Sequence, residues 1–257
     1  MHDDYQAKIE SVKKLLRESK NVLFITGAGI SAESGLPTYR GIGGLYNDAM
    51  TEEDIPIEEA LSGYMLSLNP HITWKHIANI EAACRGAAHN RAHSVIAEME
   101  NHFERLWVLT QNVDGFHRDA GSKNIIDIHG DVKDLFCQKC GFAIRVEDYS
   151  ELEIPPKCKE CTHYLRPDVV LFGELLPPQK TSQLHNQLSE GFDVVFSIGT
   201  SSLFPYISGP VLEATRAGIP TIEINPGQTE VSAMVSIKFS EKAGTVMDDI
   251  WEDLEAR

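Results

Sequence analysis

The stretch Val22-Leu-Phe-Ile-Thr26, followed directly by Gly27-Ala-Gly-Ile-Ser-Ala32, predicts the fold of this chain. The first five residues form a short apolar run, which is typical of a strand buried on both faces of a parallel sheet. The next six match the G-x-G-x-x-G/A pattern of a dinucleotide-binding loop, whose glycines allow a tight turn and a close approach to a pyrophosphate. This pattern is weak alone, because a glycine-rich turn without a ligand also fits it.

Similar apolar runs recur along the chain, with helical patterns between several of them. The helical patterns lie around residues 89–103, 178–190 and 208–217, after an amphipathic opening helix over residues 6–19. Strands that alternate with helices predict an α/β fold built on a Rossmann-like, doubly wound parallel sheet. The other runs are Leu106–Thr110, Ile125–Ile128, Val169–Phe172, Asp193–Ile198, Thr221–Ile224 and Val235–Phe239.

Two stretches interrupt this alternation of strands and helices. Residues 41–88 contain no convincing strand and are predicted to form helices and loops, and residues 131–167 carry four of the five cysteines. We expect these two stretches to form a smaller domain, composed of a helical module and a zinc-ribbon module. Residues 1–40, 89–130 and 168–257 are predicted to form the larger, Rossmann-type domain that binds the nucleotide.

The four cysteines occur in two identical pairs, Cys137-Gln-Lys-Cys140 and Cys158-Lys-Glu-Cys161. A two-residue gap lets one turn present both sulfur atoms to an ion, and two such turns complete a closed tetrahedral site for one structural Zn²⁺. Disulfides are the alternative, and they require an oxidising compartment. The polar, acidic start of the chain shows no signal peptide, so we expect zinc and a cytoplasmic location.

Composition limits the partners of this chain. Its 257 residues are 42% hydrophobic and 24% charged, which are ordinary values for a globular protein, and its formal net charge is −15. Phosphate binding needs basic clusters, so this charge argues against nucleic acid or an anionic membrane as a partner. It also argues against a nucleic-acid-binding zinc ribbon, because no stripe of Lys or Arg accompanies the cysteines.

Polar residues follow several of the predicted strands. Gln111, Asn112 and Asp114 come after one strand, His129-Gly130 after the next, and Gly199-Thr-Ser-Ser202 and Asn225-Pro-Gly227 after two later strands. Ligands of open α/β sheets collect at the carboxyl ends of strands, and a histidine there suits proton transfer near neutral pH. Polar connecting loops and an ordinary histidine are the alternatives. A dehydrogenase is disfavoured, because Pro37 and the missing second strand break the usual pattern.

In combination and in this order, these motifs resemble those of the sirtuin family, bacterial type, over residues 5–250. The segments are Gly27-Ala-Gly-Ile-Ser-Ala-Glu-Ser-Gly-Leu-Pro-Thr-Tyr-Arg40, Thr110-Gln-Asn-Val-Asp-Gly115, His129-Gly130, the four cysteines, Leu165-Arg-Pro-Asp-Val-Val-Leu-Phe-Gly-Glu174, Gly199-Thr-Ser201 and Asn225-Pro226. The resemblance implies an NAD-dependent protein lysine deacetylase with a structural zinc ion. The acyl-lysine oxygen would attack the nicotinamide ribose, nicotinamide would leave, and the acyl group would pass to ADP-ribose.

The resemblance also assigns roles to individual residues. His129 would act as general base on a ribose hydroxyl, and Val170, Phe172 and Gly173 would pair with the backbone of an acyl-lysine peptide. Cys137, Cys140, Cys158 and Cys161 would bind the metal. The residues expected to contact NAD are Gly27, Ala28, Gly29, Ser31, Ala32, Arg40, Gln111, Asn112, Asp114, Gly199, Thr200, Ser201, Asn225, Pro226, Gly227 and Ala243.

One departure from the family pattern concerns the acyl group. Sirtuins that prefer succinyl or malonyl groups carry a Tyr-x-x-Arg pair on a helix of the small domain, where both side chains share one face. Residues 72–81 contain no such pair, and one alignment places Ile77 and Ile80 at its positions. We therefore expect an uncharged acyl group, acetyl first. A protein mono-ADP-ribosyltransferase, which cleaves NAD in the same way, remains the alternative activity.

Overall fold

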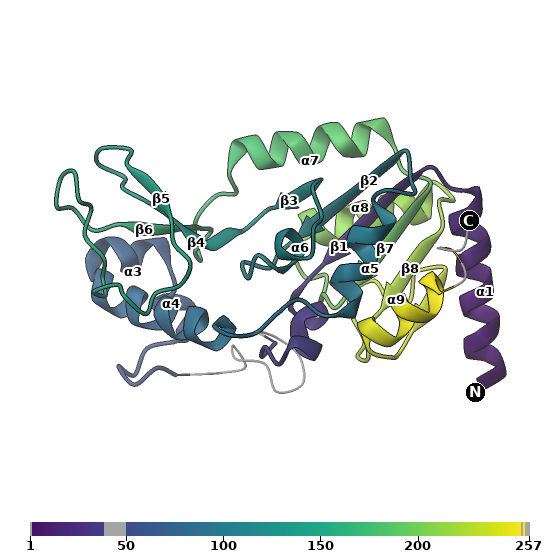
Figure 1. Cartoon of the computed structure of the whole chain (residues 1–257), viewed down its shortest axis with the longest axis horizontal. Coiled ribbons are helices and arrows are strands. Elements are labelled where there is room, and N and C mark those ends of the chain that lie inside the picture. Colours follow the sequence, from purple (N-terminus) through teal and green to yellow (C-terminus); the bar gives the residue numbers. More distant parts are fainter. Residues whose placement is uncertain (1, 39–49, 253, 255–257) are drawn as a thin grey trace.

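The central sheet has six parallel strands, in the order β3 (Ile125–Asp127), β2 (Arg105–Thr110), β1 (Asn21–Thr26), β7 (Val194–Ile198), β8 (Thr221–Ile224) and β9 (Ile237–Phe239) (Figure 1). The computed structural model describes residues 2–38, 50–252 and 254. The predicted fold class, a Rossmann-like parallel sheet, is confirmed.

Helices cover both faces of this sheet. One hydrophobic cluster joins the sheet to α1 (His2–Glu18), α5 (Arg91–Met99) and α9 (Ala243–Trp251), and a second joins it to α7 (Pro178–Glu190) and α8 (Pro205–Arg216). Within β1, Val22 and Phe24 belong to the first cluster, whereas Leu23 and Ile25 belong to the second. Because both faces are buried, the strand is apolar at successive positions rather than at alternate ones.

The strand order reverses between β1 and β7. From β1 the chain builds one half of the sheet through β2 and β3, and it later returns to the other side of β1 as β7. At this point the turns after the two strands meet, because the N–H of Gly29 donates to the carbonyl oxygen of Gly199 at 2.8 Å. In open α/β sheets ligands bind in the crevice at such a reversal. The 3₁₀ helix η1 (Ala28–Ser34) replaces the long helix that Pro37 made improbable.

A second, smaller sheet is antiparallel, in the order β5 (Ala143–Arg145), β4 (Gly130–Phe136) and β6 (Arg166–Val169). It shares a hydrophobic cluster with α2 (Ile57–Ala60), α3 (Gly63–Leu68) and α4 (Pro70–Cys84). At its centre Trp74 is fully buried, and its indole N–H donates to the carbonyl oxygen of Leu165 at 3.0 Å. This separate cluster supports the predicted two-domain division, which stays a prediction.

The prediction of a strand over Val169–Phe172 was wrong in its position. β6 ends at Val169 and belongs to the small sheet, and the following residues run alongside the α2–α3 junction. There the N–H of Phe172 donates to Leu61 and its carbonyl oxygen accepts from Gly63. The run is apolar because Leu171 and Phe172 pack in the small hydrophobic cluster, not because they join the large sheet. Of the predicted helical region 41–88, residues 41–49 lie outside the described residues.

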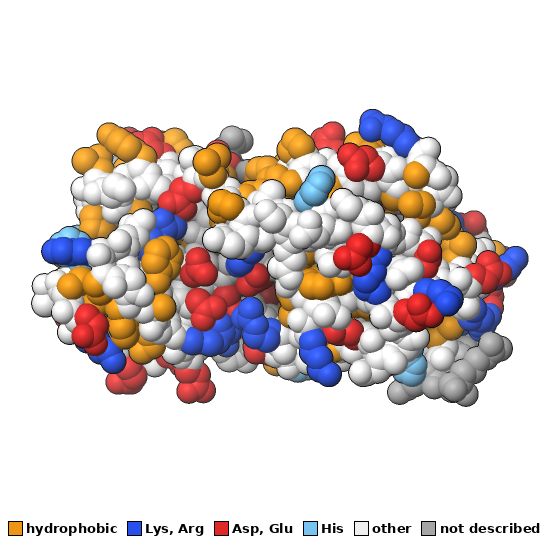
Figure 2. All heavy atoms as spheres, turned by 90° about the horizontal axis from the view of Figure 1, so that it is seen from above, with side chains coloured by type: hydrophobic (Ala, Val, Ile, Leu, Met, Phe, Trp, Pro, Cys, Tyr) orange, Lys and Arg blue, Asp and Glu red, His pale blue; other side chains and the backbone are white. Residues whose placement is uncertain are grey.

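The surface carries charges of both signs. On the face seen in Figure 2, Lys and Arg side chains lie among Asp and Glu side chains and do not form a continuous basic band. Within the described residues, no helix is both long and apolar enough to cross a membrane. The short helix α6 (Phe116–Asp119) completes the described elements of Figure 1.

The close approach of the turns at Gly29 and Gly199 leads to a prediction about a side chain at position 29. A Cβ atom at this position would lie 2.6 Å from the Cα of Gly199, so Gly29→Ala should lower the free energy of unfolding by roughly 1–3 kcal/mol. Urea unfolding measures this loss. The control is Gly35→Asn, where a Cβ meets no atom within 4 Å and asparagine tolerates the left-handed backbone, so the loss should stay under about 1 kcal/mol. An unchanged urea midpoint for Gly29→Ala would contradict the importance of this contact.

Candidate active site

Two neighbouring cavities lie at the carboxyl ends of β1, β2 and β7, between the two sheets. The larger has a volume of about 690 Å³ and is lined by the turns after the strands of the large sheet, by residues of the hydrophobic cluster on α7 and α8, and by residues of the small sheet and its cluster. The smaller has a volume of about 390 Å³ and extends toward α4. Ala28 and Asn112 line both. The larger cavity also contains Gly27, Gly29, Ala32, Gln111, His129, Val170, Phe172, Gly173, Gly199, Thr200, Ser201, Asn225, Pro226 and Gly227 of the predicted site.

Among the described residues predicted to contact NAD, one does not line either cavity. Ala243 is buried at the first position of α9, where the next residue, Gly244, donates its N–H to a carboxylate oxygen of Glu33 at 2.6 Å. This bond ties the start of α9 to η1, so Ala243 lies behind the glycine loop instead of on the cavity wall. Arg40 lies outside the described residues.

Polar side chains after β2 bond to the glycine loop. The amide of Asn112 donates to the carbonyl oxygen of Gly27 and to the hydroxyl of Ser31, both at 3.2 Å. The Ser31 hydroxyl in turn donates to a carboxylate oxygen of Asp114 at 2.7 Å. Burial raises the pKa of Asp114, while bonds from Phe116 N–H and Ser31 lower it. The loop after β2 is therefore held against the loop after β1, with one carboxyl group enclosed between them.

Two further histidines lie buried behind Ser31, and the sequence patterns did not single them out. His93 Nε2 lies 3.5 Å from the Ser31 hydroxyl, and His117 Nε2 lies 2.9 Å from the hydroxyl of Thr26. Their rings meet edge to face, with centroids 4.9 Å apart. Burial lowers the pKa of His93 to about 2 and that of His117 to about 3, so both rings are neutral at pH 7.

The turns after β7 and β8 form the opposite side of the larger cavity. Gln111 donates from its side-chain amide to the hydroxyl of Thr200 at 2.7 Å, and the Asn225 amide donates to the carbonyl oxygen of Thr200 at 3.1 Å. Behind this turn, Lys238 donates to the carbonyl oxygen of Gly227 and to the buried carboxylate of Glu223, each at 2.8 Å. These bonds bring three strand ends together around one space.

His129 lies at the wall of the larger cavity, between β3 and β4. The turn depends on Gly130, which has φ of 90° and lies so close to Asp168 that a Cβ would overlap the Asp168 carbonyl oxygen. His129 Nδ1 lies 3.1 Å from the carbonyl oxygen of Gln111, and Nε2 lies 2.7 Å from the hydroxyl of Tyr206. Burial lowers the pKa of His129 to about 4, so the imidazole is neutral at pH 7 and can accept a proton.

The predicted peptide-contact segment is already bonded within the chain. The N–H of Val170 donates to the carbonyl oxygen of His129 at 2.9 Å, and the N–H of Phe172 donates to that of Leu61 at 3.0 Å. A peptide that pairs with these N–H groups would have to break those bonds. A carbonyl oxygen accepts two hydrogen bonds, so the carbonyl oxygens of this segment keep capacity for a peptide.

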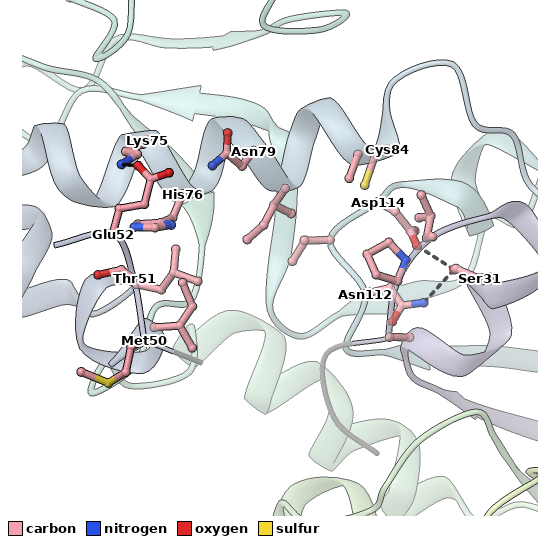
Figure 3. A pocket seen from close by; sticks show the side chains of 18 residues that line it. Ser31, Met50, Thr51, Glu52, Lys75, His76, Asn79, Cys84, Asn112 and Asp114 are labelled. Carbon is pink, nitrogen blue, oxygen red and sulfur yellow. Dashed lines mark hydrogen bonds and ion pairs between the residues drawn. The ribbon is translucent and has the colours of Figure 1, made fainter. Parts of the chain in front are cut away.

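The smaller cavity has polar groups at both ends. Figure 3 shows Ser31, Asn112 and Asp114 at one end, and Lys75, His76 and Asn79 of α4 at the other, with Cys84 near Asp114. Lys75 is paired with Glu52 at 2.7 Å. Burial raises the pKa of Cys84 to about 12, so its thiol stays protonated and is a poor nucleophile.

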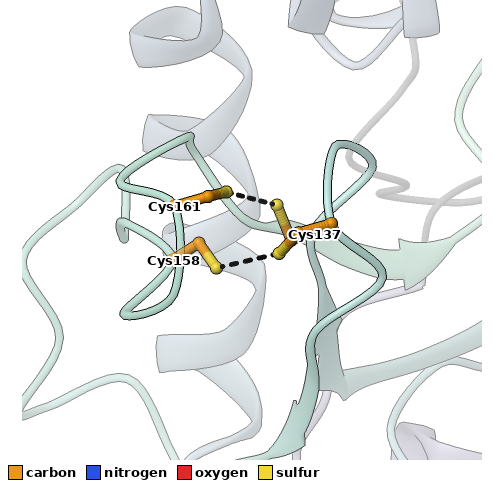
Figure 4. Close-up of side chains that lie close together, drawn as sticks. Cys137, Cys158 and Cys161 are labelled. Carbon is orange, nitrogen blue, oxygen red and sulfur yellow. Dashed lines mark hydrogen bonds between the residues drawn. The ribbon is translucent and has the colours of Figure 1, made fainter.

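The fold brings the four cysteines of the two pairs together (Figure 4). None of them lines either cavity. All four sulfur atoms lie within 4.8 Å of one another. The Sγ atoms of Cys137 and Cys161 are 3.4 Å apart and those of Cys140 and Cys158 are 3.5 Å apart, far longer than a disulfide bond. Tetrahedral zinc with Zn–S bonds of about 2.3 Å separates its sulfur ligands by roughly 3.8 Å, so this donor set fits one structural ion.

Comparison with known proteins identifies the family. The model of the Sir2 family matches residues 27–204. The chain is 46% identical to "NAD-dependent protein deacylase 2" of Pseudomonas aeruginosa over 250 residues, which cover 96% of this chain and 97% of the relative. It is 38% identical to "NAD-dependent protein deacylase" of Aquifex aeolicus over 242 residues, 93% of this chain and 98% of that protein.

Solved structures give the same result. A Sir2 homologue in complex with NAD superposes with a TM-score of 0.85 at 34% identity and covers 96% of this chain and 94% of that one. A Sir2 complex with a p53 peptide and NAD⁺ has a TM-score of 0.82 at 26% identity, with coverage of 97% and 99%. The chain belongs to the Sir2 family, so the predicted resemblance to the sirtuins is confirmed. It is an enzyme of the sirtuin type.

Substitution of one cysteine tests whether the cluster binds a structural zinc ion. Cys137→Ser should lose the single zinc ion and unfold the small cluster of hydrophobic residues around Trp74, because metal binding and folding of such a site are coupled. Metal content by mass spectrometry and the melting temperature measure the two effects. The control is Cys84→Ser, which should keep its zinc. A zinc-free Cys137→Ser protein with an unchanged melting temperature would contradict a structural role.

Proposed function

We propose that the protein is an NAD-dependent protein lysine deacetylase, which transfers the acyl group from lysine to ADP-ribose and releases nicotinamide. The observation that carries this proposal is the position of His129, which shares one cavity with the loops after β1, β2, β7 and β8. Support comes from relatives named as NAD-dependent protein deacylases and from solved family members in complex with NAD. NAD is then a consumed co-substrate, and one zinc ion is structural.

The binding residues divide according to their surroundings. We assign the glycine loop Gly27–Ala32 and the turn Gly199–Ser201 to the phosphates and riboses, because small residues let the backbone approach these groups closely. Ser31, Asn112 and Asp114 form the enclosed end of the site, where a carboxamide group finds both donors and an acceptor. When bound, NAD would supply a glycosidic bond whose cleavage by the acyl oxygen makes the acyl carbon electrophilic.

His129 is proposed to act as the general base. The carbonyl oxygen of Gln111 can only accept a hydrogen bond, so His129 carries its proton on Nδ1 and its lone pair on Nε2. Burial keeps the ring neutral at pH 7. The base is thus ready to take up a proton from a ribose hydroxyl at Nε2, on the side of the ring that meets Tyr206.

Acyl-lysine proteins or peptides are the proposed partners, and Val170, Phe172 and Gly173 the proposed peptide contacts. A Sir2 complex with a p53 peptide supports a peptide substrate for this family. We retain the predictions that nucleic acid and membranes are not partners and that the protein is cytoplasmic; the net charge of −15 supports the first of these. We also propose that the large sheet with its two hydrophobic clusters is the core of the larger predicted domain, and that the cluster around Trp74 is the core of the smaller one. The larger cavity then lies between the two domains.

Acetyl is the proposed acyl group. Ile77 and Ile80, three residues apart on α4, both line the larger cavity, and Ile77 is only 2% exposed. Among the described residues that line this cavity none is Lys or Arg, and Glu174 adds a carboxylate. Tyr64 is 70% exposed, and Arg85 is bonded to Glu81. A succinyl carboxylate would therefore be desolvated against apolar side chains without a cation to pair with.

Products distinguish the proposed activity from its alternative. With NAD and an acetyl-lysine peptide, mass spectrometry should detect free nicotinamide, deacetylated peptide and O-acetyl-ADP-ribose. His129→Ala should bind NAD but lose acyl transfer by at least about a hundredfold, since general bases contribute factors of this size. ADP-ribose left on a protein would favour the mono-ADP-ribosyltransferase, and the absence of free nicotinamide would contradict both activities.

A pair of matched peptides tests the acyl preference. We expect kcat/KM for a succinyl-lysine peptide to be at least about tenfold below that for the acetyl-lysine version, a difference of about 1.4 kcal/mol. The double variant Ile77→Tyr with Ile80→Arg places a phenol and a guanidinium on one helix face, so it should raise desuccinylation relative to deacetylation. Faster desuccinylation by the unaltered protein would contradict the preference.

A further inference from the structure

The hydroxyl of Tyr206 is hydrogen-bonded to Nε2 of His129, the nitrogen proposed to accept the proton. It lies 2.7 Å from Nε2, the nitrogen that carries the lone pair, because Nδ1 is committed to the carbonyl oxygen of Gln111. The phenol must therefore donate its own proton to Nε2 in this arrangement. A ribose hydroxyl that enters the cavity meets the base with the phenol already bonded to it.

Tyr206 is held firmly in this position. It lies in the first turn of α8, which starts at Pro205, and its ring stacks on that of Phe204 with centroids 5.3 Å apart and planes at 12°. Both rings meet the His129 ring edge to face, at 6.0 Å for Phe204 and 5.9 Å for Tyr206. Both also pack against the hydrophobic cluster between the large sheet and α8. Moving the phenol away from Nε2 would disturb the contacts of its ring with Phe204 and His129.

Tyr206 is also open to the substrate side. It lines the larger cavity together with His129, the proposed base, and Thr200, which belongs to the turn assigned to the phosphates and riboses. A phenol has one proton to donate and two lone pairs that accept, so Tyr206 can bond to Nε2 and to an incoming hydroxyl at once. Neither the strand-end motifs nor the resemblance to the family indicated this residue.

We propose that Tyr206 is a further catalytic residue, which relays the proton of the ribose hydroxyl to His129. This inference rests on the proposed deacetylase function. In the step, the O–H bond of the ribose breaks and its proton forms a new bond to Tyr206 Oη, while the Tyr206 proton moves to His129 Nε2. The electron pair left on the ribose oxygen forms the bond to the acyl carbon, while the π electron pair between that carbon and the lysine nitrogen moves onto the nitrogen. The phenol ends neutral, the imidazole becomes imidazolium, and no further reactant is needed.

The variant Tyr206→Phe tests the relay, because it removes the hydroxyl and keeps the ring that packs on Phe204. Two reactions are measured on the same acetyl-lysine peptide. Exchange of labelled nicotinamide into NAD reports glycosidic bond cleavage, which precedes the action of the base, and formation of O-acetyl-ADP-ribose reports acyl transfer. We expect exchange at or above the wild-type rate, and acyl transfer slower by at least about tenfold. The control is Tyr164→Phe, which changes an exposed tyrosine of the smaller predicted domain. It should leave both rates unchanged.

A proton inventory adds a readout that a purely structural role would not affect. Rates of acyl transfer in mixtures of H₂O and D₂O should follow a curved dependence for the wild type, because two protons move, and a linear one for Tyr206→Phe. Unchanged or faster acyl transfer in Tyr206→Phe would overturn the relay, as would an equal loss of exchange and transfer. An inactive wild-type protein would overturn the proposed function and the relay with it, so the two failures are distinguishable.

Discussion

The hydrogen bond from the Gly29 N–H to the carbonyl oxygen of Gly199 joins the two halves of the site. It forms where the strand order reverses between β1 and β7, and it tolerates no side chain at Gly29, where a Cβ would lie 2.6 Å from Gly199. Because the two turns touch, the residues after β2 and β8 bond across them, Gln111 to the Thr200 hydroxyl and Asn225 to its carbonyl oxygen. The cavity is thus defined by backbone packing before any ligand enters.

Burial then determines the chemistry of the titratable groups around this cavity. It lowers the pKa values of His93, His117 and His129 and raises that of Asp114, so these three histidines are uncharged at pH 7. For His129, burial and a bond to a carbonyl oxygen act together, because the first keeps the ring neutral and the second selects the tautomer. The cysteine cluster lines neither cavity, and its residues pack with the small sheet.

Much of the fold was predictable because its signals are local. Apolar runs identified five of the six strands of the large sheet closely and Ile237–Phe239 within two residues, since parallel strands buried on both faces are mostly apolar along their length. The run Val169–Phe172 misled, because burial against α2 and α3 leaves the same apolar pattern as burial in a sheet. Most of the predicted loop residues line the larger cavity and Ser31 and Asp114 line the smaller one, whereas Ala243 is placed behind the glycine loop and Arg40 lies outside the described residues.

By itself the sequence determined the parallel α/β architecture, the dinucleotide-type loop, the zinc-type cysteine spacing and the membership of the Sir2 family, since periodicity and spacing are written along the chain. Only the tertiary structure decided which groups meet through space. Tyr206 lies 77 positions from His129, and nothing along the chain predicts that its hydroxyl bonds to Nε2. The same is true of Ile77 and Ile80 on the cavity wall, because a helix places side chains on a face but the packing of whole elements decides what that face meets.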